Sequence, residues 1–98
     1  MNWSSKHINL GSIKQSKKVF VLFLNQGENK EITSLTSSCG CSSPTYNKES
    51  KVLQVAFTPP KIPYHLRSKG FYKSTKFIYI EYADKTTERL SFSATVTK

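Results

Sequence analysis

Residues 37–44 of this 98-residue chain read SSCGCSSP and contain both of its cysteines, Cys39 and Cys41, on either side of Gly40. An apolar, strand-like segment precedes this run, and Pro44 closes it. Glycine relaxes the restrictions on backbone conformation, and proline cannot donate to a hydrogen-bonded ladder. The run therefore predicts a tight turn at the end of a strand.

On both sides of this turn, short apolar stretches alternate with turn residues, and no window keeps apolar residues at helical spacing for three turns. In residues 87–97 the apolar side chains occupy every second position, which is typical of a sheet with one buried and one solvated face. We expect strands at residues 3–10, 17–25, 30–37, 51–58, 73–82 and 87–97, and a long loop at 59–72. This pattern predicts a single all-β domain over residues 1–98, an immunoglobulin-like β-sandwich of about seven strands.

At the cysteine turn, the chain resembles a bacterial family of unknown function that carries a T-S-C-G-C-T-x-P signature. That family is related to Hydin-like and major-sperm-protein-like immunoglobulin folds. Residues 38–44 resemble the signature, and residues 10–13, 25–27 and 53–57 resemble its F-G-T-I, N-T-G and I-x-V-x-F elements. Residues 46–50 replace the family's usual P-G turn. The resemblance implies an immunoglobulin-like fold over most of the chain and assigns no reaction.

Cys39 and Cys41 allow three interpretations, which the sequence leaves open. The favoured one is structural, with two small side chains packing one end of the sandwich around a glycine turn. The second is a tight, easily reduced disulfide across the glycine. The third is a metal site, but a structural zinc ion needs four donors, and the only imidazoles, His7 and His65, are distant in the sequence. We predict no metal or other cofactor.

Catalytic chemistry finds little support in the sequence. Nothing places a histidine beside the cysteines to make a nucleophilic pair, and no phosphate-binding glycine loop is present. Carboxylates are few, and Asp84 and Glu88, which flank a predicted hairpin, are expected to be turn and surface charges. We predict a non-enzymatic protein without catalytic residues.

The net charge of +9 is unevenly distributed, because no acidic residue lies between Glu49 and Glu81. A basic patch attracts nucleic acid, an anionic membrane surface or an acidic protein, although a solvated basic face is the plainer interpretation. The aromatic residues among these cations either stack on bases or close the end of the sandwich. The candidate polyanion-binding residues are Lys61, Arg67, Lys69, Lys73 and Lys76.

Residues 19–24 read VFVLFL, so this predicted strand is apolar on both faces. Comparison with the family pattern places Val21 and Phe23 toward the core. The other large side chains then point outward, together with two aromatic residues of the segment 73–82. A free monomer seldom exposes such a stripe, so we expect a protein partner to cover it. The predicted partner-binding residues are Phe20, Leu22, Leu24, Phe77 and Tyr79.

The longest apolar run is six residues, far short of the roughly 20 that span a bilayer, and the N-terminus has no apolar signal region. We therefore expect a cytoplasmic location, although members of the resembling family usually carry a secretion signal. If a signal has been removed, a periplasmic or secreted location is the alternative.

The predicted function is that of a structural or interaction module, an accessory subunit of a larger assembly such as the capsid or tail of a phage virion. Its expected partners are the protein subunits of that assembly, and a homo-oligomer remains an alternative. Two other functions stay open. One is a nucleic-acid-binding accessory protein that uses the basic loop 59–76, and the other is a thiol- or metal-binding protein that uses Cys39 and Cys41.

Overall fold

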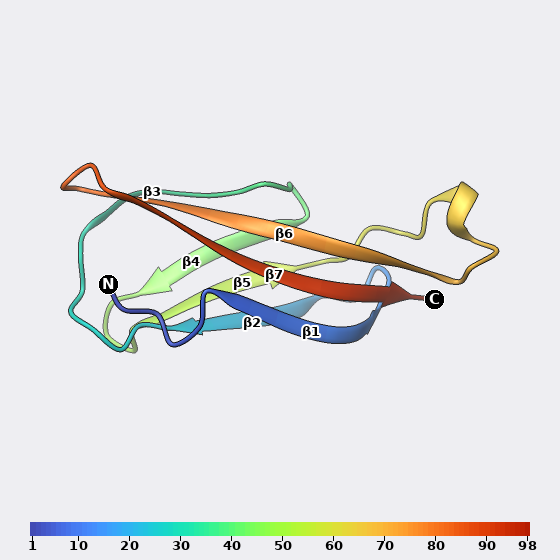
Figure 1. The fold of residues 1–98 in the computed structure, drawn as a ribbon, viewed down its shortest axis with the longest axis horizontal. Coiled ribbons are helices and arrows are strands. Elements are labelled where there is room, and N and C mark those ends of the chain that lie inside the picture. Colours follow the sequence, from blue (N-terminus) through green and yellow to red (C-terminus); the bar gives the residue numbers. More distant parts are fainter.

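The computed structural model describes residues 1–98, and it contains seven β-strands, one short 3₁₀ turn and no α-helix (Figure 1). The elements are β1 (His7–Lys14), β2 (Val19–Leu24), β3 (Ile32–Ser37), β4 (Ser42–Asn47), β5 (Val52–Phe57), η1 (Tyr64–Leu66), β6 (Phe71–Tyr82) and β7 (Thr87–Thr97). The structure contains no helix that is long and apolar enough to span a membrane.

The strands form two sheets that pack face to face. One sheet has four strands in the order β1-β7-β6-β3, and the other has three in the order β2-β5-β4. β1 pairs with β7 in parallel, and the other paired strands are antiparallel. The resulting sandwich is elongated, with dimensions of 47 × 20 × 16 Å. The structure therefore confirms the predicted immunoglobulin-like β-sandwich of seven strands.

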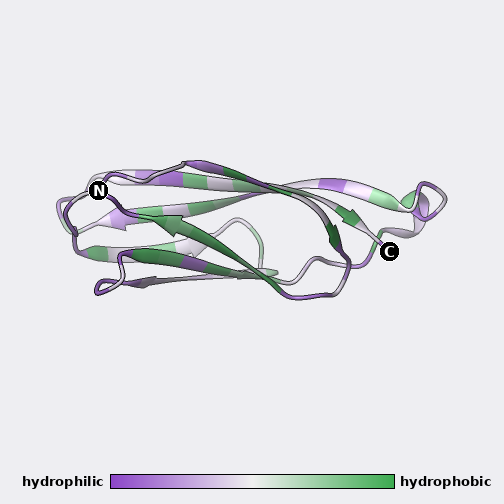
Figure 2. Ribbon diagram, turned by 90° about the horizontal axis from the view of Figure 1, so that it is seen from below, coloured by the Kyte–Doolittle hydropathy of each residue, from purple (hydrophilic) through white to green (hydrophobic).

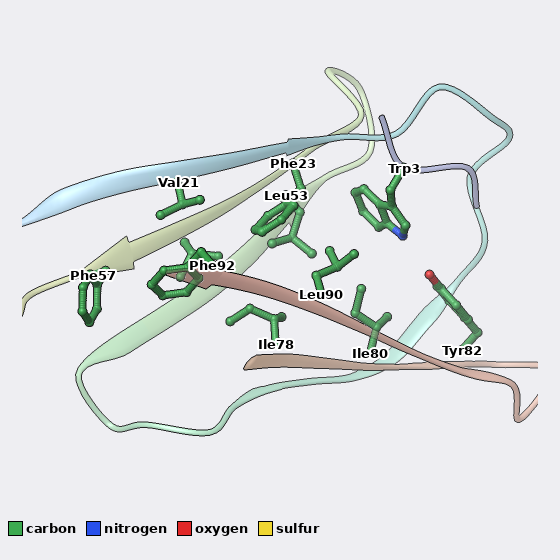
Figure 3. Packing of buried hydrophobic residues seen from close by; sticks show 11 residues of the cluster. Trp3, Val21, Phe23, Leu53, Phe57, Ile78, Ile80, Tyr82, Leu90 and Phe92 are labelled. Carbon is green, nitrogen blue, oxygen red and sulfur yellow. The ribbon is translucent and has the colours of Figure 1, made fainter. Parts of the chain in front are cut away.

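The core lies between the two sheets and is built from every second side chain of β2, β5, β6 and β7. Val21 and Phe23 of β2 are buried, which confirms the predicted orientation of that strand. In Figure 3 they point toward β6 and β7 of the opposite sheet, and Figure 2 shows hydrophobic colour concentrated along the strands of both layers. Phe57 and Phe92 meet edge to face, with their ring centroids 5.1 Å apart. The other buried residues that these strands contribute to the core include Leu53, Val55, Ile78, Ile80, Tyr82, Leu90, Ala94 and Val96.

The first strand begins and ends later than the sequence analysis predicted. It was expected at residues 3–10, but β1 begins at His7 and continues through Gly11 to Lys14. Gly11 adopts a left-handed conformation with φ of 71°, and the register with β7 shifts between Asn9 and Ser12. A glycine at such a bulge lets the strand bend without ending.

The sequence analysis also missed β4, because Pro44 was interpreted as the end of a turn. Pro44 lies inside this strand. β4 is at an edge of its sheet, where proline's missing N–H group leaves no ladder hydrogen bond unmade. The chain therefore passes from β3 in one sheet to β4 in the other through a short turn that contains both cysteines.

Candidate functional site

The outer face of β2 carries three large apolar side chains that nothing covers. The exposed fractions of Phe20, Leu22 and Leu24 are 57%, 50% and 47%. They alternate with the buried Val21 and Phe23, so the same strand contributes to the core on one side and presents an apolar stripe on the other. The predicted outward orientation of the three residues is confirmed.

β2 is also an edge strand, and part of its backbone is unpaired. The N–H group of Asn25 donates to the Lys51 carbonyl at 2.8 Å on the β5 side, whereas the carbonyl of Leu24 accepts from Ser4 on the opposite, free side. Because backbone groups alternate in direction along a strand, those of Phe20 and Leu22 point to the free side as well. The N-terminal segment reaches only the far end of this edge, where Trp3 forms a single bridge with Asn25.

A groove of about 780 Å³ crosses the same outer face. It extends from Leu22 over Val52 and Gln54 of β5 to Thr45 and Asn47 of β4. Six of its nine lining residues are polar or charged. The groove thus gives the apolar stripe a polar border, an arrangement typical of protein interfaces.

Phe77 and Tyr79 lie on the outer face of the other sheet, so they do not join the β2 stripe into one surface. Their rings stack with centroids 6.5 Å apart, and the guanidinium of Arg89 lies 4.9 Å from the Phe77 ring centroid. Phe77 is half-buried, whereas Tyr79 is 44% exposed. The five predicted partner-binding residues therefore divide into two separate groups.

The cysteine turn is closed by a disulfide between Cys39 and Cys41, whose Cα atoms are 5.2 Å apart. The N–H group of Cys41 donates to the Sγ atom of Cys39 at 3.1 Å, and Cys41 packs against the core. Serine side chains also hold the turn. Ser37 accepts a hydrogen bond from the Cys39 N–H group at 3.2 Å, and the buried Ser42 donates to the Cys39 carbonyl at 3.3 Å.

Gly40 does not play the role in this turn that the sequence predicted. It does not adopt the left-handed conformation, and a Cβ atom at this position would meet no atom within 4 Å. The turn therefore depends on the disulfide and the serine hydrogen bonds rather than on the conformational freedom of glycine.

The chain contains no group of three or more His, Cys, Asp or Glu side chains that could hold a metal ion. The structural role of the cysteines stays a prediction.

The candidate polyanion-binding residues lie around the 58–70 loop and on the first half of β6. Lys61, Arg67 and Lys69 belong to the loop, and Lys73 and Lys76 follow on β6. The tyrosine and phenylalanine side chains of this region are divided between two roles. Tyr64 is 85% exposed, whereas the Tyr72 hydroxyl donates to the Pro60 carbonyl at 2.6 Å and so fixes the loop.

Glu88 was expected to be a surface charge, and that prediction is wrong. The carboxylate accepts hydrogen bonds from the Trp3 indole at 3.1 Å and from the Tyr82 hydroxyl, and Lys6 lies 3.5 Å away. Although partial burial alone would raise the pKa of Glu88, these hydrogen bonds and the charge of Lys6 lower it. Burial and the neighbouring carboxylate raise the pKa of Tyr82. The strand spacing gave no signal for this network, because Trp3 is 85 residues away in the sequence.

Asp84, the other carboxylate of the hairpin, does have the expected role of a turn charge. Its side chain accepts a hydrogen bond from the Thr86 N–H group at 3.0 Å and pairs with Lys30 at 2.8 Å. The hydrogen bonds from Lys30 and Thr86 hold the pKa of Asp84 well below its usual range.

By its strand order and layers, the chain is an immunoglobulin-like β-sandwich. A family model described as "Protein of unknown function (DUF1573)" matches residues 1–96, and the chain belongs to this family. No curated protein matches the sequence.

A solved structure with a similar fold is that of a 2,6-sialyltransferase from Vibrionaceae Photobacterium sp. JT-ISH-224, crystallised with the donor product CMP and the acceptor substrate lactose. The similarity has a TM-score of 0.52 and 20% sequence identity, and it covers 95% of this chain. The chain spans only 18% of that enzyme. The likeness shows the fold alone.

Proposed function

We propose that this protein is a non-enzymatic interaction module, an accessory subunit that docks onto a larger protein assembly through the free edge and outer face of β2. The observation that carries the proposal is the uninterrupted apolar edge at Phe20 and Leu22. Both side chains are at least half exposed there, and both backbones lack a partner.

A comparison of the four edge strands supports this choice. Natural sheets protect their edges with bulges, prolines or charges, because an unpaired edge recruits other strands. β1 has a bulge after Asn9, β3 has a register shift after Ile32, and β4 contains Pro44. β2 pairs with β5 in continuous register and contains no charge and no proline. It is therefore the one edge strand of the four without such protection.

The occupant that fits this edge is an extended segment of a partner subunit that adds a strand beside β2. Its backbone would pair with the free groups of Phe20 and Leu22, and its apolar side chains would cover the stripe. Covering three side chains that are about half exposed contributes about 2–4 kcal/mol, half of the value for full burial. Lys17 and Lys18 precede β2 and are exposed, so an acidic residue beside the partner's apolar segment would complement them.

A phage virion is the assembly we favour, with the protein made in the cytoplasm and carried in the capsid or tail. The support is an analogy between this fold and the small immunoglobulin-like domains that attach to such particles. The resemblance to Hydin-like and major-sperm-protein-like domains points to the same class of binding module. Genes for capsid, portal or tail proteins beside this one would strengthen the placement.

The test compares two matched variants. Leu22→Lys places a charge on the proposed docking face, and Tyr79→Lys places one on the opposite sheet at a similarly exposed position, 44% against 50%. Partners captured from a lysate of the producing cells by the unmodified protein are identified, purified and titrated against each variant. We expect Leu22→Lys to weaken binding at least 100-fold and Tyr79→Lys to change it less than about twofold.

Thermal unfolding serves as the folding control, because both positions are exposed and both variants should remain folded. Equal binding by the two variants would contradict the proposed face. Sedimentation equilibrium tests the remaining alternative, which is a homo-oligomer. If the protein binds only itself, and Leu22→Lys abolishes that association, β2 forms a homo-oligomer and the accessory-subunit proposal is wrong.

A further inference from the structure

The charges of this protein are segregated along the length of the sandwich. All six acidic residues lie at the end formed by the β2–β3 connection, the β4–β5 turn and the β6–β7 hairpin. Six of the fifteen cations accompany them there, so that end is close to neutral. Figure 1 shows this end opposite the 58–70 loop and the C-terminus.

The remaining nine cations give the other half of the molecule the whole net charge of +9. Three lie in residues 14–18, three in the 58–70 loop, two on the first half of β6, and the last is Lys98. No acidic side chain accompanies them, and both salt bridges of the protein, Lys6–Glu88 and Lys30–Asp84, are at the neutral end. A one-signed surface of this kind attracts polyanions.

Within this half, three of the cations line one pocket. It has a volume of about 230 Å³ and is lined by Gln15, Lys61, Ile62, Arg67 and Lys98. The Oε1 atom of Gln15 accepts a hydrogen bond from the Ile62 N–H group at 2.7 Å, so the NH₂ group of the carboxamide remains as a donor. Cations and an amide donor without an acidic side chain make a pocket suited to a phosphate group.

The loop that forms the pocket is anchored at several points. The Ser16 N–H group donates to the Pro59 carbonyl at 2.8 Å, and the Tyr72 hydroxyl donates to the Pro60 carbonyl. Pro59 and Ile62 are buried. The hydrogen bonds and the burial hold the backbone on both sides of Lys61 beside the end of β1, which lowers the ordering cost of binding.

An exposed aromatic residue lies beside this pocket. Tyr64 is 85% exposed, and the Arg67 guanidinium lies 5.6 Å from the centroid of its ring. An exposed ring next to phosphate-binding cations is the combination by which proteins bind single strands, because a base stacks on the ring while the backbone is neutralised. The cations alone would also suit a membrane surface or an acidic peptide, and the exposed ring beside them favours a nucleic acid.

We propose that this basic end binds single-stranded nucleic acid, with a phosphate in the pocket of Gln15, Lys61, Arg67 and Lys98 and an adjacent base stacked on Tyr64. The proposal is independent of the β2 docking face, since the pocket includes no β2 residue.

The experiment measures fluorescence anisotropy of a labelled 20-nucleotide oligothymidine against the whole protein over a range of salt concentrations. One phosphate in the pocket and two more on the other cations of this half predict a log–log slope of about −2 for single strands. The double variant Lys61→Gln/Arg67→Gln removes the phosphate site of the pocket, so it should weaken binding at least tenfold at low salt and make the slope less steep by about 0.7. Tyr64→Ala should weaken binding about tenfold and leave the slope unchanged.

The matched control is Lys85→Gln/Arg89→Gln, which removes the same number of exposed cations from the neutral end and should leave the affinity nearly unchanged. An equal loss in this control, or no binding at low salt, would overturn the proposal. Anionic phospholipid vesicles and heparin are titrated in parallel. If either binds as tightly as the oligonucleotide, and Tyr64→Ala has no effect on any of the three, the end is a general polyanion surface and the nucleic-acid assignment is wrong.

Discussion

On the outer face of β2, Phe20, Leu22 and Leu24 lie uncovered, whereas on the outer face of β6, Phe77 and Tyr79 stack on each other under Arg89. Both strands alternate these residues with buried ones, so their sequence patterns are similar. Their positions differ, because β6 lies between β7 and β3 and β2 lies at an edge. An apolar residue on an outer face is stronger evidence of a docking surface when its strand also lies at an open edge of the sheet.

The largest expected effect is a difference in stability between substitutions on the buried side and on the exposed side of β2. Replacing Phe23 with Ala removes a fully buried ring from the core and should lower the free energy of unfolding by about 3–5 kcal/mol. Replacing Leu22 with Ala removes a half-exposed side chain and should cost less than about 1 kcal/mol. Urea denaturation measures both values. A similar cost at the two positions would mean that Leu22 is part of the core and would end the docking account.

A smaller effect concerns the N-terminal segment, which covers the far end of the β2 edge and reaches the other sheet through Trp3 and Glu88. The pKa of Glu88 is lowered in the folded protein, so its carboxylate stabilises the fold above its ordinary pKa. This contribution should be lost as the pH falls below about 4.5. Replacing Glu88 with Gln should lower the free energy of unfolding at pH 7 by about 1.5–3 kcal/mol, the value of hydrogen bonds to a charged group.

The same variant should show a weaker decrease of stability between pH 5 and pH 3, to be measured by chemical denaturation at each pH. Glu49→Gln is the control for the loss of one negative charge, because that carboxylate is exposed and forms no salt bridge. An unchanged acid profile in Glu88→Gln would show that the Trp3 and Tyr82 hydrogen bonds do not stabilise the carboxylate.

The smallest effect is expected at the turn that connects the two sheets. Replacing both Cys39 and Cys41 with Ser should lower the free energy of unfolding by about 1–2 kcal/mol, because a disulfide that closes so short a loop restricts the unfolded chain only slightly. Binding of the β2 partner should be preserved. Metal analysis of protein purified without chelator is the second measurement. Stoichiometric zinc or copper that the double variant lacks would replace the structural role with a metal site.

The period-two pattern was sufficient to predict the core strands such as β5 and β7, because alternation along a strand is a local property. The outward side of β2 was predicted from the family pattern instead, because that strand is apolar on both faces. It failed at β4, where an edge position tolerates Pro44, and at β1, where a glycine bulge carries the strand past Gly11. Those outcomes depend on which strand lies at an edge and on the parallel pairing of β1 with β7, and neither is encoded nearby in the sequence.

Similar reasons apply to the candidate sites. The basic residues of the segment 61–76 were recognised, but Gln15 and Lys98 joined the pocket only when the fold brought the end of β1 and the C-terminus beside the 58–70 loop. Phe77 and Tyr79 were assigned to the β2 surface because their alternation is the same, and only the sheet order separates them. The Glu88 network was missed because its partner Trp3 comes from the other end of the sequence.

Residue-resolved hydrogen exchange of β2 tests the central claim most directly. In the free protein, the amides of Phe20 and Leu22 should exchange rapidly, because they face the open edge, while those of Val21 and Phe23 should be protected by their pairing with β5. Addition of the purified partner should slow exchange at Phe20 and Leu22 by at least tenfold and leave Tyr79 unchanged. Protection of Phe20 and Leu22 already in the free monomer, or no change on binding, would contradict the account.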